Sequence, residues 1–278
     1  MLMLLLASFA AEASFQGLRV HYTNYGAGST AVVLIHGWTC DESFWQYQVP
    51  ALRARHRVIT IDLPGHGRSE VPAEREMTMD NFARAIDAVL QEAGVSRAIL
   101  AGHSMGTPVI RQFARLFPAK TAGLVLMDGT IFRPQDAAKR QGRGQIYAGE
   151  EGRQKRLGVM RAYFGPATST AVRQQIERVS GATAEATAVG AINGMLALAV
   201  WQDESPVRVP ALAVYQGQPG VSGDYLRQLF PLLSYHRVAG TGHFLMMEKP
   251  EKVNPLLVKF VGRVFPGGRQ SQSGIAPH

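Results

Sequence analysis

The segment Arg97–Phe117, with the sequence RAILAGHSMGTPVIRQFARLF, joins an apolar run, a serine flanked by glycines and a helical pattern. Arg97–Ala101 has the composition of a buried strand, and Pro108–Phe117 has the periodicity of a helix. Between them, Gly102–Gly106 (GHSMG) matches the pattern Gly-x-Ser-x-Gly. In a strand–turn–helix setting the two glycines remove side chains that would collide with the strand and the helix, so that the serine hydroxyl projects from the sheet edge. The segment therefore predicts a nucleophilic serine, Ser104, at the end of a strand.

Further apolar runs on both sides of this segment predict other strands of the same sheet. They are Ala31–Ile35, Arg57–Ile61, Gly123–Met127, Ala211–Tyr215 and Ser234–Val238. Runs that are apolar on both faces are typical of central parallel strands covered by helices on both sides. A helical stripe begins after Thr78 and ends before Gly94, and a last helix is predicted over Pro250–Val264. This order of elements predicts an α/β fold with an open, mainly parallel sheet, whose ligands bind at the carboxyl ends of the strands.

The strand pattern stops at Gly129 and resumes only after Pro206. The intervening residues contain three helical stretches, Gln154–Tyr163, Thr170–Val179 and Thr187–Trp201. A helical insertion between two sheet strands predicts a cap over the strand ends. We therefore expect a core made of residues 14–129 and 207–265, a helical cap over residues 130–206, and a flexible, polar tail over residues 266–278.

The composition excludes several classes of protein. The chain has 278 residues, of which 46% are hydrophobic, so it can bury the core of one large domain or of two small ones. No apolar run approaches the ~18–20 residues that span a bilayer, so no integral membrane association is predicted. The single cysteine, Cys40, excludes an internal disulfide and a cysteine-rich zinc site. Dinucleotide-binding, P-loop and metal-ligand patterns are absent from the sequence, so no cofactor and no metal are predicted.

The N-terminal residues 1–13 (MLMLLLASFAAEA) allow two interpretations. The apolar start and the small residues Ala11 and Ala13 around Glu12 fit a secretory signal with its cleavage site. No lysine or arginine precedes the apolar run, which favours an N-terminal extension instead. The first interpretation predicts an exported or periplasmic protein and the second a cytoplasmic one.

The net charge of +8 is concentrated in the predicted cap. Residues 129–165 contain eight basic and three acidic side chains. This distribution argues against a nucleic-acid partner. It indicates either a preference for anionic substrates or, as we prefer, a solvated outer face of amphipathic helices.

Four short motifs give the chain a resemblance to a known superfamily. They are HGW at His36–Trp38, DLPGHGRS at Asp62–Ser69, GHSMG at Gly102–Gly106 and GTGH at Gly240–His243. In their order and separation they resemble the α/β-hydrolase superfamily, over roughly Phe15–Val264. The resemblance implies a central, mainly parallel sheet flanked by helices, with an inserted helical cap. It also implies that Asp62, which ends a strand, hydrogen-bonds the loop backbone and takes no part in the chemistry.

The same resemblance assigns the remaining parts of a catalytic site. It implies that the backbone N–H groups of Trp38 and Met105 form an oxyanion hole, because these residues follow His-Gly on the first loop and the nucleophile, respectively. It implies that His243 is the base, since His243 follows the last strand in a glycine-rich loop and the order serine, acid, histidine fits the family.

The acid is where this chain departs from the usual pattern of the family. Most relatives carry it in the loop after the seventh strand, at the position that Gly220 occupies here. Two substitutes are present. Asp128 follows the sixth strand beside the strand of the serine, and we favour it as the acid that orients His243. The alternative is Asp224, which is also explained as a carboxylate in the first turn of a helix; Asp128 likewise has the alternative role of a loop cap.

Together these residues predict a serine hydrolase that cleaves small-molecule carboxylic esters through an acyl-enzyme. A serine at the elbow argues against the dehalogenase and epoxide-hydrolase branches, whose nucleophile is a carboxylate. The same residues would also serve a thioesterase, a lactonase, a C–C bond hydrolase or a cofactor-free haloperoxidase. A protein of another class, a ligand-binding receptor without catalysis, stays open because the usual acid is missing.

Overall fold

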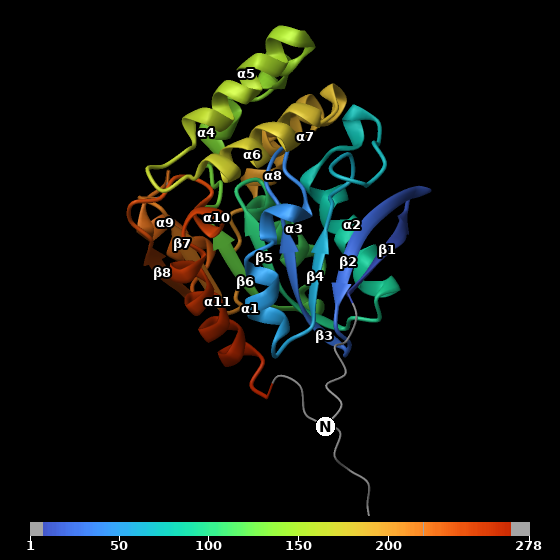
Figure 1. Cartoon of the computed structure of the whole chain (residues 1–278), viewed down its shortest axis with the longest axis vertical. Coiled ribbons are helices and arrows are strands. Elements are labelled where there is room, and N and C mark those ends of the chain that lie inside the picture. Colours follow the sequence, from blue (N-terminus) through green and yellow to red (C-terminus); the bar gives the residue numbers. More distant parts are fainter. Residues whose placement is uncertain (1–7, 219, 268–278) are drawn as a thin grey trace, which may run out of the picture.

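The computed structural model describes residues 8–218 and 220–267, and an eight-stranded sheet forms its centre (Figure 1). The strand order is β1-β2-β4-β3-β5-β6-β7-β8, in which β1–β2 and β2–β4 pair antiparallel and all other neighbours pair parallel. The strands are β1 (Ser8–Phe15), β2 (Leu18–Tyr25), β3 (Thr30–Ile35), β4 (Val58–Ile61), β5 (Arg97–His103), β6 (Thr121–Met127), β7 (Ala211–Tyr215) and β8 (Leu233–Arg237). The predicted α/β fold with a mainly parallel sheet is confirmed.

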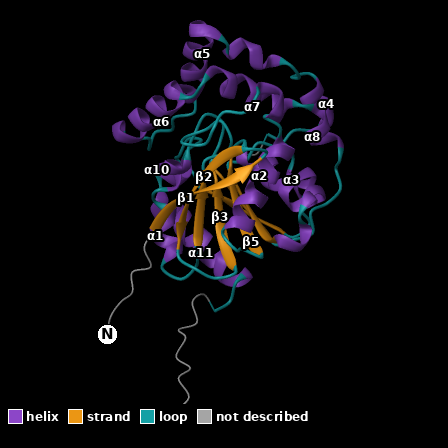
Figure 2. Cartoon of the chain, turned by 90° about the vertical axis from the view of Figure 1, so that its right-hand side faces the viewer, coloured by secondary structure: helices purple, strands orange, loops and turns teal. Residues whose placement is uncertain are grey.

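Helices cover both faces of the sheet. The α-helices are α1 (Gln48–Arg53), α2 (Met79–Glu92), α3 (Gly106–Leu116), α4 (Pro134–Ala138), α5 (Gly149–Ala162), α6 (Thr170–Ala182), α7 (Glu185–Leu196), α8 (Leu198–Gln202), α9 (Gly223–Leu229), α10 (Leu245–Glu248) and α11 (Pro250–Val264). Short 3₁₀ helices are η1 (Glu42–Trp45), η2 (Glu74–Glu76), η3 (Pro118–Lys120) and η4 (Arg143–Tyr147). Helices α1 and α11 pack together on one face of the sheet, and α2 and α3 pack together on the other (Figure 2).

The sequence explains where these elements begin and end. Strands β3, β4, β6 and β7 are buried along nearly their whole length, as their apolar runs require when helices cover both faces. Helix α2 begins where the Thr78 hydroxyl accepts the N–H of Asn81, and it ends before Gly94, which has the left-handed φ of 64°. Both boundaries of this helix are those expected from the sequence.

Helices α4–α8, which we call the helical layer, lie over the carboxyl edge of the parallel strands (Figures 1 and 2). Polar contacts attach the layer to the loops at that edge. The Trp38 indole N–H donates to the carbonyl of Ala188 at 2.8 Å, and the Thr187 hydroxyl donates to the carbonyl of Gly65 at 2.9 Å. The loops that follow the strands are therefore enclosed between the sheet and the layer.

Two details differ from the sequence patterns. The antiparallel strands β1 and β2 are not predicted by them, because polar residues interrupt both strands and neither contains a continuous apolar run. The helical stretch Thr187–Trp201 is two helices, separated at Ala197, where the backbone is extended. The break is bridged by a bond from the Trp201 indole N–H to the carbonyl of Met195.

Both predicted terminal segments extend beyond the described residues. Residues 1–7 and 268–278 lie outside them, so most of the predicted tail is not described. The predicted cleavage position, Ala13, lies inside β1, so cleavage there would remove most of that strand. Among the described helices, no single one is long and apolar enough to cross a membrane, although the sharply bent pair Thr170–Ala182 and Glu185–Gln202 meets the criteria of length and composition.

Candidate active site

Ser104 occupies a strained turn between β5 and α3. Its φ of 51° lies in the left-handed region, which costs a residue with a side chain about 1–3 kcal/mol. The glycines on either side make this turn sterically feasible. A Cβ atom on Gly102 would overlap the carbonyl of Gly106, and a Cβ atom on Gly106 would lie 2.7 Å from the carbonyl oxygen of Ile35. These clashes are those that the Gly-x-Ser-x-Gly pattern predicts.

His243 and Asp128 form a close pair beside Ser104. Asp128 directly follows β6, and its carboxylate atom Oδ2 lies 2.6 Å from the His243 Nδ1 atom. The second oxygen, Oδ1, accepts the backbone N–H of Gln216 at 3.1 Å. The two side chains are only 14% and 11% exposed, so solvent screens their interaction weakly. Because Nδ1 faces the carboxylate, Nε2 is the ring atom that remains for proton exchange.

The structure leaves the alternative acid, Asp224, at the surface. Its side chain is 96% exposed in the first turn of α9 and pairs with Arg227 at 3.1 Å. This arrangement is the helix-terminal role that the sequence offers as its other explanation. Gly220, at the usual position of the acid, is also exposed. Of the two candidates, the structure brings only Asp128 into contact with His243.

The peptide unit between Gly37 and Trp38 is held from its carbonyl side. The Gly37 carbonyl lies 2.8 Å from Nδ1 of His36, which donates to it, and it also accepts the N–H of Cys40 at 3.2 Å. The N–H of Leu63 donates to Nε2 of the same imidazole at 3.0 Å, which assigns the neutral tautomer to His36. Burial lowers the pKa of His36 accordingly. The direction of the Trp38 N–H is therefore fixed by its own peptide plane.

Met105 lies on the other side of Ser104, immediately before the first residue of α3. Backbone N–H groups at a helix N-terminus lack partners within the helix and carry the positive end of its dipole. The N–H groups of Met105 and Trp38 thus come from two elements that both border Ser104.

His103, from the GHSMG motif, contacts His243. Its Nε2 atom lies 2.9 Å from the His243 carbonyl, to which it donates, and the two rings are 4.6 Å apart. Burial, reinforced by repulsion from His243, holds the pKa of His103 well below its ordinary value. The neutral imidazole of His103, at the end of β5, therefore supports the His243 loop from the side of the sheet. No pattern in the sequence indicates this contact.

Tyr163 covers His243 from the side of the helical layer. The ring centroids are 4.4 Å apart, and the Tyr163 carbonyl accepts the N–H of His243 at 2.9 Å. The sequence places Tyr163 only at the end of a helix. The neighbouring Gly165 is the one local signal of a close approach between backbones.

Ser104 and His243 open into one small cavity of about 50 Å³ beneath the helical layer. Its apolar walls are formed by Trp38, Cys40, Met160, Ile192, Met195 and Phe244. Cys40 is buried in this wall, and burial raises the pKa of its thiol well above its ordinary value. The volume is far below the ~300–1,000 Å³ of common ligand sites.

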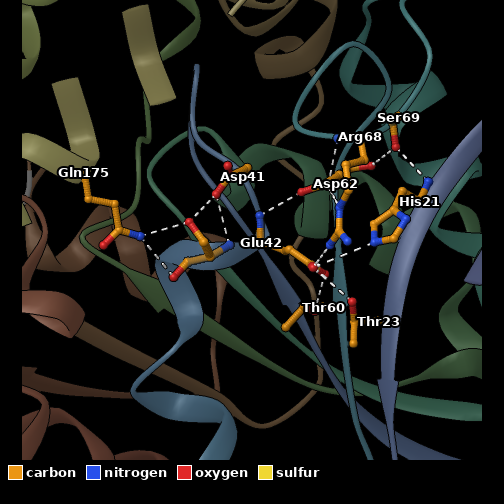
Figure 3. Close-up of polar contacts among 10 residues, drawn as sticks. His21, Thr23, Asp41, Glu42, Thr60, Asp62, Arg68, Ser69 and Gln175 are labelled. Atoms are coloured by element: carbon orange, nitrogen blue, oxygen red, sulfur yellow. Dashed lines mark hydrogen bonds and ion pairs between the residues drawn. The ribbon is translucent and has the colours of Figure 1, made fainter. Parts of the chain in front are cut away.

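Asp62 belongs to a separate polar network at the end of β4 (Figure 3). Its carboxylate accepts the backbone N–H groups of Glu42 at 2.8 Å and Arg68 at 3.0 Å. The Glu42 carboxylate accepts the hydroxyls of Thr60 and Thr23 and the guanidinium of Arg68. The prediction that Asp62 stabilises its loop is confirmed. In the part of the chain that the structure describes, no cluster of three His, Cys, Asp or Glu side chains could hold a metal ion.

Comparison with known proteins identifies the fold family. Residues 32–256 match the alpha/beta hydrolase family. The chain belongs to this family. An enol-lactonase from Burkholderia xenovorans LB400 has a similar structure, with a TM-score of 0.79 at 21% identity, over 90% of this chain and 99% of that one. At that identity the likeness concerns the fold alone.

Two curated relatives show how diverse the similar sequences are. A dihydrolipoyllysine-residue acetyltransferase component of the acetoin cleaving system from Cupriavidus necator is 27% identical over 90% of this chain. A 2-hydroxy-6-oxononadienedioate/2-hydroxy-6-oxononatrienedioate hydrolase from Paraburkholderia phymatum is 40% identical over 116 residues, 40% of this chain. This alpha/beta hydrolase covers 68% of the length of the first relative and 40% of the second.

Proposed function

We propose that this alpha/beta hydrolase is a serine hydrolase that cleaves carboxylic esters, with Ser104 as nucleophile, His243 as base and Asp128 as acid. The observation that carries the proposal is the 2.6 Å contact between Asp128 and Nδ1 of His243, which lines the same cavity as the strained Ser104. A carboxylate at this distance holds the imidazole in one tautomer and stabilises its charged form.

The reaction proceeds in two stages. Ser104 Oγ attacks the ester carbonyl while His243 Nε2 takes the hydroxyl proton, and the imidazolium then returns that proton to the leaving alcohol. Water attacks the resulting acyl-serine by the reverse sequence of proton transfers, which releases the carboxylic acid. The charge on the carbonyl oxygen is stabilised by the backbone N–H groups of Trp38 and Met105, each worth on the order of 10²–10³ in rate.

In this proposal residues 130–206, which contain the helical layer, act as a cap over the active site. It supplies Met160, Tyr163, Ile192 and Met195 to the cavity, which has room for a short acyl group only. A cavity needs about 10–15 Å³ to hold one water molecule, so 50 Å³ corresponds to a few waters. We therefore expect acetyl and propionyl esters to be better substrates than octanoyl esters.

The test is hydrolysis of nitrophenyl esters of increasing acyl length by the wild type and by Ser104→Ala. We expect the wild type to turn over the short esters and the variant to lose at least about 10⁴-fold in kcat, since the nucleophile acts together with its partners. Absence of turnover, or turnover that Ser104→Ala leaves intact, would refute the proposal. A preference for octanoyl over acetyl esters would refute the short-acyl assignment alone.

A second candidate is a C–C bond hydrolase, which would use the same three residues. It is favoured by the 40% identity over 116 residues to the Paraburkholderia hydrolase. Turnover of 2-hydroxy-6-oxononadienedioate with a higher kcat/KM than any nitrophenyl ester would establish this candidate in place of the first.

A further inference from the structure

The segment Tyr163–Thr168, which connects α5 to α6 in the helical layer, lies directly against the loop that carries His243. The carbonyl of Tyr163 accepts the N–H of His243. Two residues further along, Gly165 and Gly242 meet backbone to backbone, because a Cβ atom on either glycine would overlap the backbone of the other segment. Only residues without a side chain allow this approach. The His243 loop is therefore supported by the helical layer as well as by the sheet.

Glu248 bridges the two sides of this contact. Its Oε2 atom accepts the N–H of Gly242 at 2.6 Å, and its Oε1 atom accepts the hydroxyl of Thr168 at 2.8 Å. The Thr168 hydroxyl in turn accepts the N–H of Gly165 at 2.8 Å. We call these bonds the Glu248–Thr168 clamp. A carboxylate that accepts a backbone N–H forms a stronger bond than a neutral acceptor, so the clamp is a strong connection.

The clamp is adjacent to the residue whose orientation matters most. Gly242 immediately precedes His243, whose ring contacts the Tyr163 and His103 rings at centroid distances of 4.4 and 4.6 Å. Tyr163 belongs to the clamped segment, whereas His103 belongs to the sheet. A displacement of Thr168 would therefore move both the backbone and one ring neighbour of His243.

We propose that Glu248 and Thr168 are positioning residues that align His243 with Asp128 and Ser104 by fixing the layer against the His243 loop. The proposal rests on the proposed function, which makes His243 the base. Docking of this part of the helical layer is then a condition for catalysis, in addition to its role in enclosing the cavity.

The decisive variant is Thr168→Val, which keeps the shape of the side chain and removes its hydroxyl. We expect kcat to fall about 10- to 100-fold at nearly unchanged KM, since a misplacement of ~1 Å can cost about 10²-fold. Thr168→Ser retains the hydroxyl and should recover most of the activity.

Thr187→Val provides a matched control at another contact between the layer and the core. The Thr187 hydroxyl is buried and bonds the Gly65 carbonyl, away from His243. This variant should lose stability as Thr168→Val does but keep the wild-type kcat. Equal losses of kcat in both variants would show that the clamp only stabilises the fold.

A spectroscopic measurement separates this inference from the proposed function. The downfield Nδ1 proton resonance of His243 reports its bond to Asp128 and needs no substrate. It should be sharp in the wild type and in Thr187→Val, and weakened or lost in Thr168→Val. If Thr168→Val does not fold, Glu248→Gln replaces it. The glutamine amide has one acceptor oxygen, whereas the Gly242 N–H and the Thr168 hydroxyl each need an acceptor. An unchanged resonance would overturn the positioning role even if the ester assays failed to show turnover.

Discussion

The carboxyl ends of β6 and β7 are neighbours in the sheet, with Met127 paired to Val214, yet they differ in every property that an acid requires. The residue after β6 is Asp128, which is largely buried and bonded to His243. The loop after β7 leads to Asp224, which is exposed and paired with a surface arginine. The chain thus has its best-placed carboxylate on the strand next to the one that usually carries the acid in the family.

The end of β7 nevertheless contributes to the arrangement at β6. The N–H of Gln216 donates to the second oxygen of Asp128, and the hydroxyl of Tyr215 donates to the carbonyl of Gly129 at 2.9 Å. Asp128 has a φ of 41°, in the left-handed region that Asp tolerates better than most residues. On the proposed function, the acid lies at the end of β6, and the neighbouring strand β7 supplies hydrogen bonds that support it.

The largest effect should distinguish the two carboxylates directly. Asp128→Asn should lower kcat for a short nitrophenyl ester by about 10⁴-fold, because the amide favours the wrong tautomer of His243. Asp224→Asn should leave kcat unchanged, as expected for an exposed surface pair. Steady-state assays of both variants, with circular dichroism as a control of folding, provide the test. The reverse ranking would assign the acid to the end of β7.

The support from β7 should be visible in a backbone substitution. Gln216→Pro removes the N–H that Asp128 accepts, whereas Gln216→Ala retains it. Loss of a hydrogen bond to a charged group corresponds to about a tenfold decrease in kcat. We expect this decrease in the proline variant only. Equal activities of the two variants would show that Asp128 is oriented by His243 alone.

A smaller effect is expected from Tyr215→Phe. The substitution removes the bond to the Gly129 carbonyl and leaves that group without its partner. The free energy of unfolding should fall by about 1 kcal/mol at neutral pH, with a smaller loss of kcat than in Gln216→Pro. Denaturant unfolding and steady-state kinetics measure the two quantities. A loss of kcat without a loss of stability would contradict a supporting role for Tyr215.

The smallest effect concerns alkaline pH. Burial and, secondarily, the charge of Asp128 raise the pKa of Tyr215 far above its ordinary value. The phenol ionises near pH 10 in the unfolded chain and stays protonated in the folded one, so its contribution is complete below pH 10 and is lost above it. At pH 10.5 the wild type should lose ~0.8 kcal/mol that Tyr215→Phe does not lose. If the free energy of unfolding of Tyr215→Phe lies equally far below that of the wild type at pH 9 and at pH 10.5, this prediction is wrong.

The sequence predicts those parts of the site that depend on local geometry. The steric need for Gly102 and Gly106 is set within five residues, so the elbow and the place of Ser104 follow from the motif. The approach of Asp128 to His243 could be anticipated because parallel strands end at one edge of the sheet. The sequence favours Asp128 but leaves Asp224 open, because the burial of the first beside His243 and the exposure of the second depend on tertiary packing.

Contacts between distant segments could not be predicted in this way. Glu248 and Thr168 are 80 residues apart, and neither belongs to a recognisable pattern. The contact of His103 with the carbonyl of His243 spans 140 residues. Both depend on how the helical layer and the last loop pack, which a single sequence does not encode as a periodicity or a motif. The strands β1 and β2 were missed because polar residues interrupt both of them, so neither has the continuous apolar run that marks the central strands.

The most direct test of the account is the rate at which a fluorophosphonate labels Ser104 in the wild type, Asp128→Asn and Asp224→Asn, with the site of labelling identified by mass spectrometry. The account predicts one phosphonyl group per chain on Ser104, formed at the same rate in the wild type and Asp224→Asn and far more slowly in Asp128→Asn. Labelling at another residue, or a slow rate in Asp224→Asn with a wild-type rate in Asp128→Asn, would contradict it.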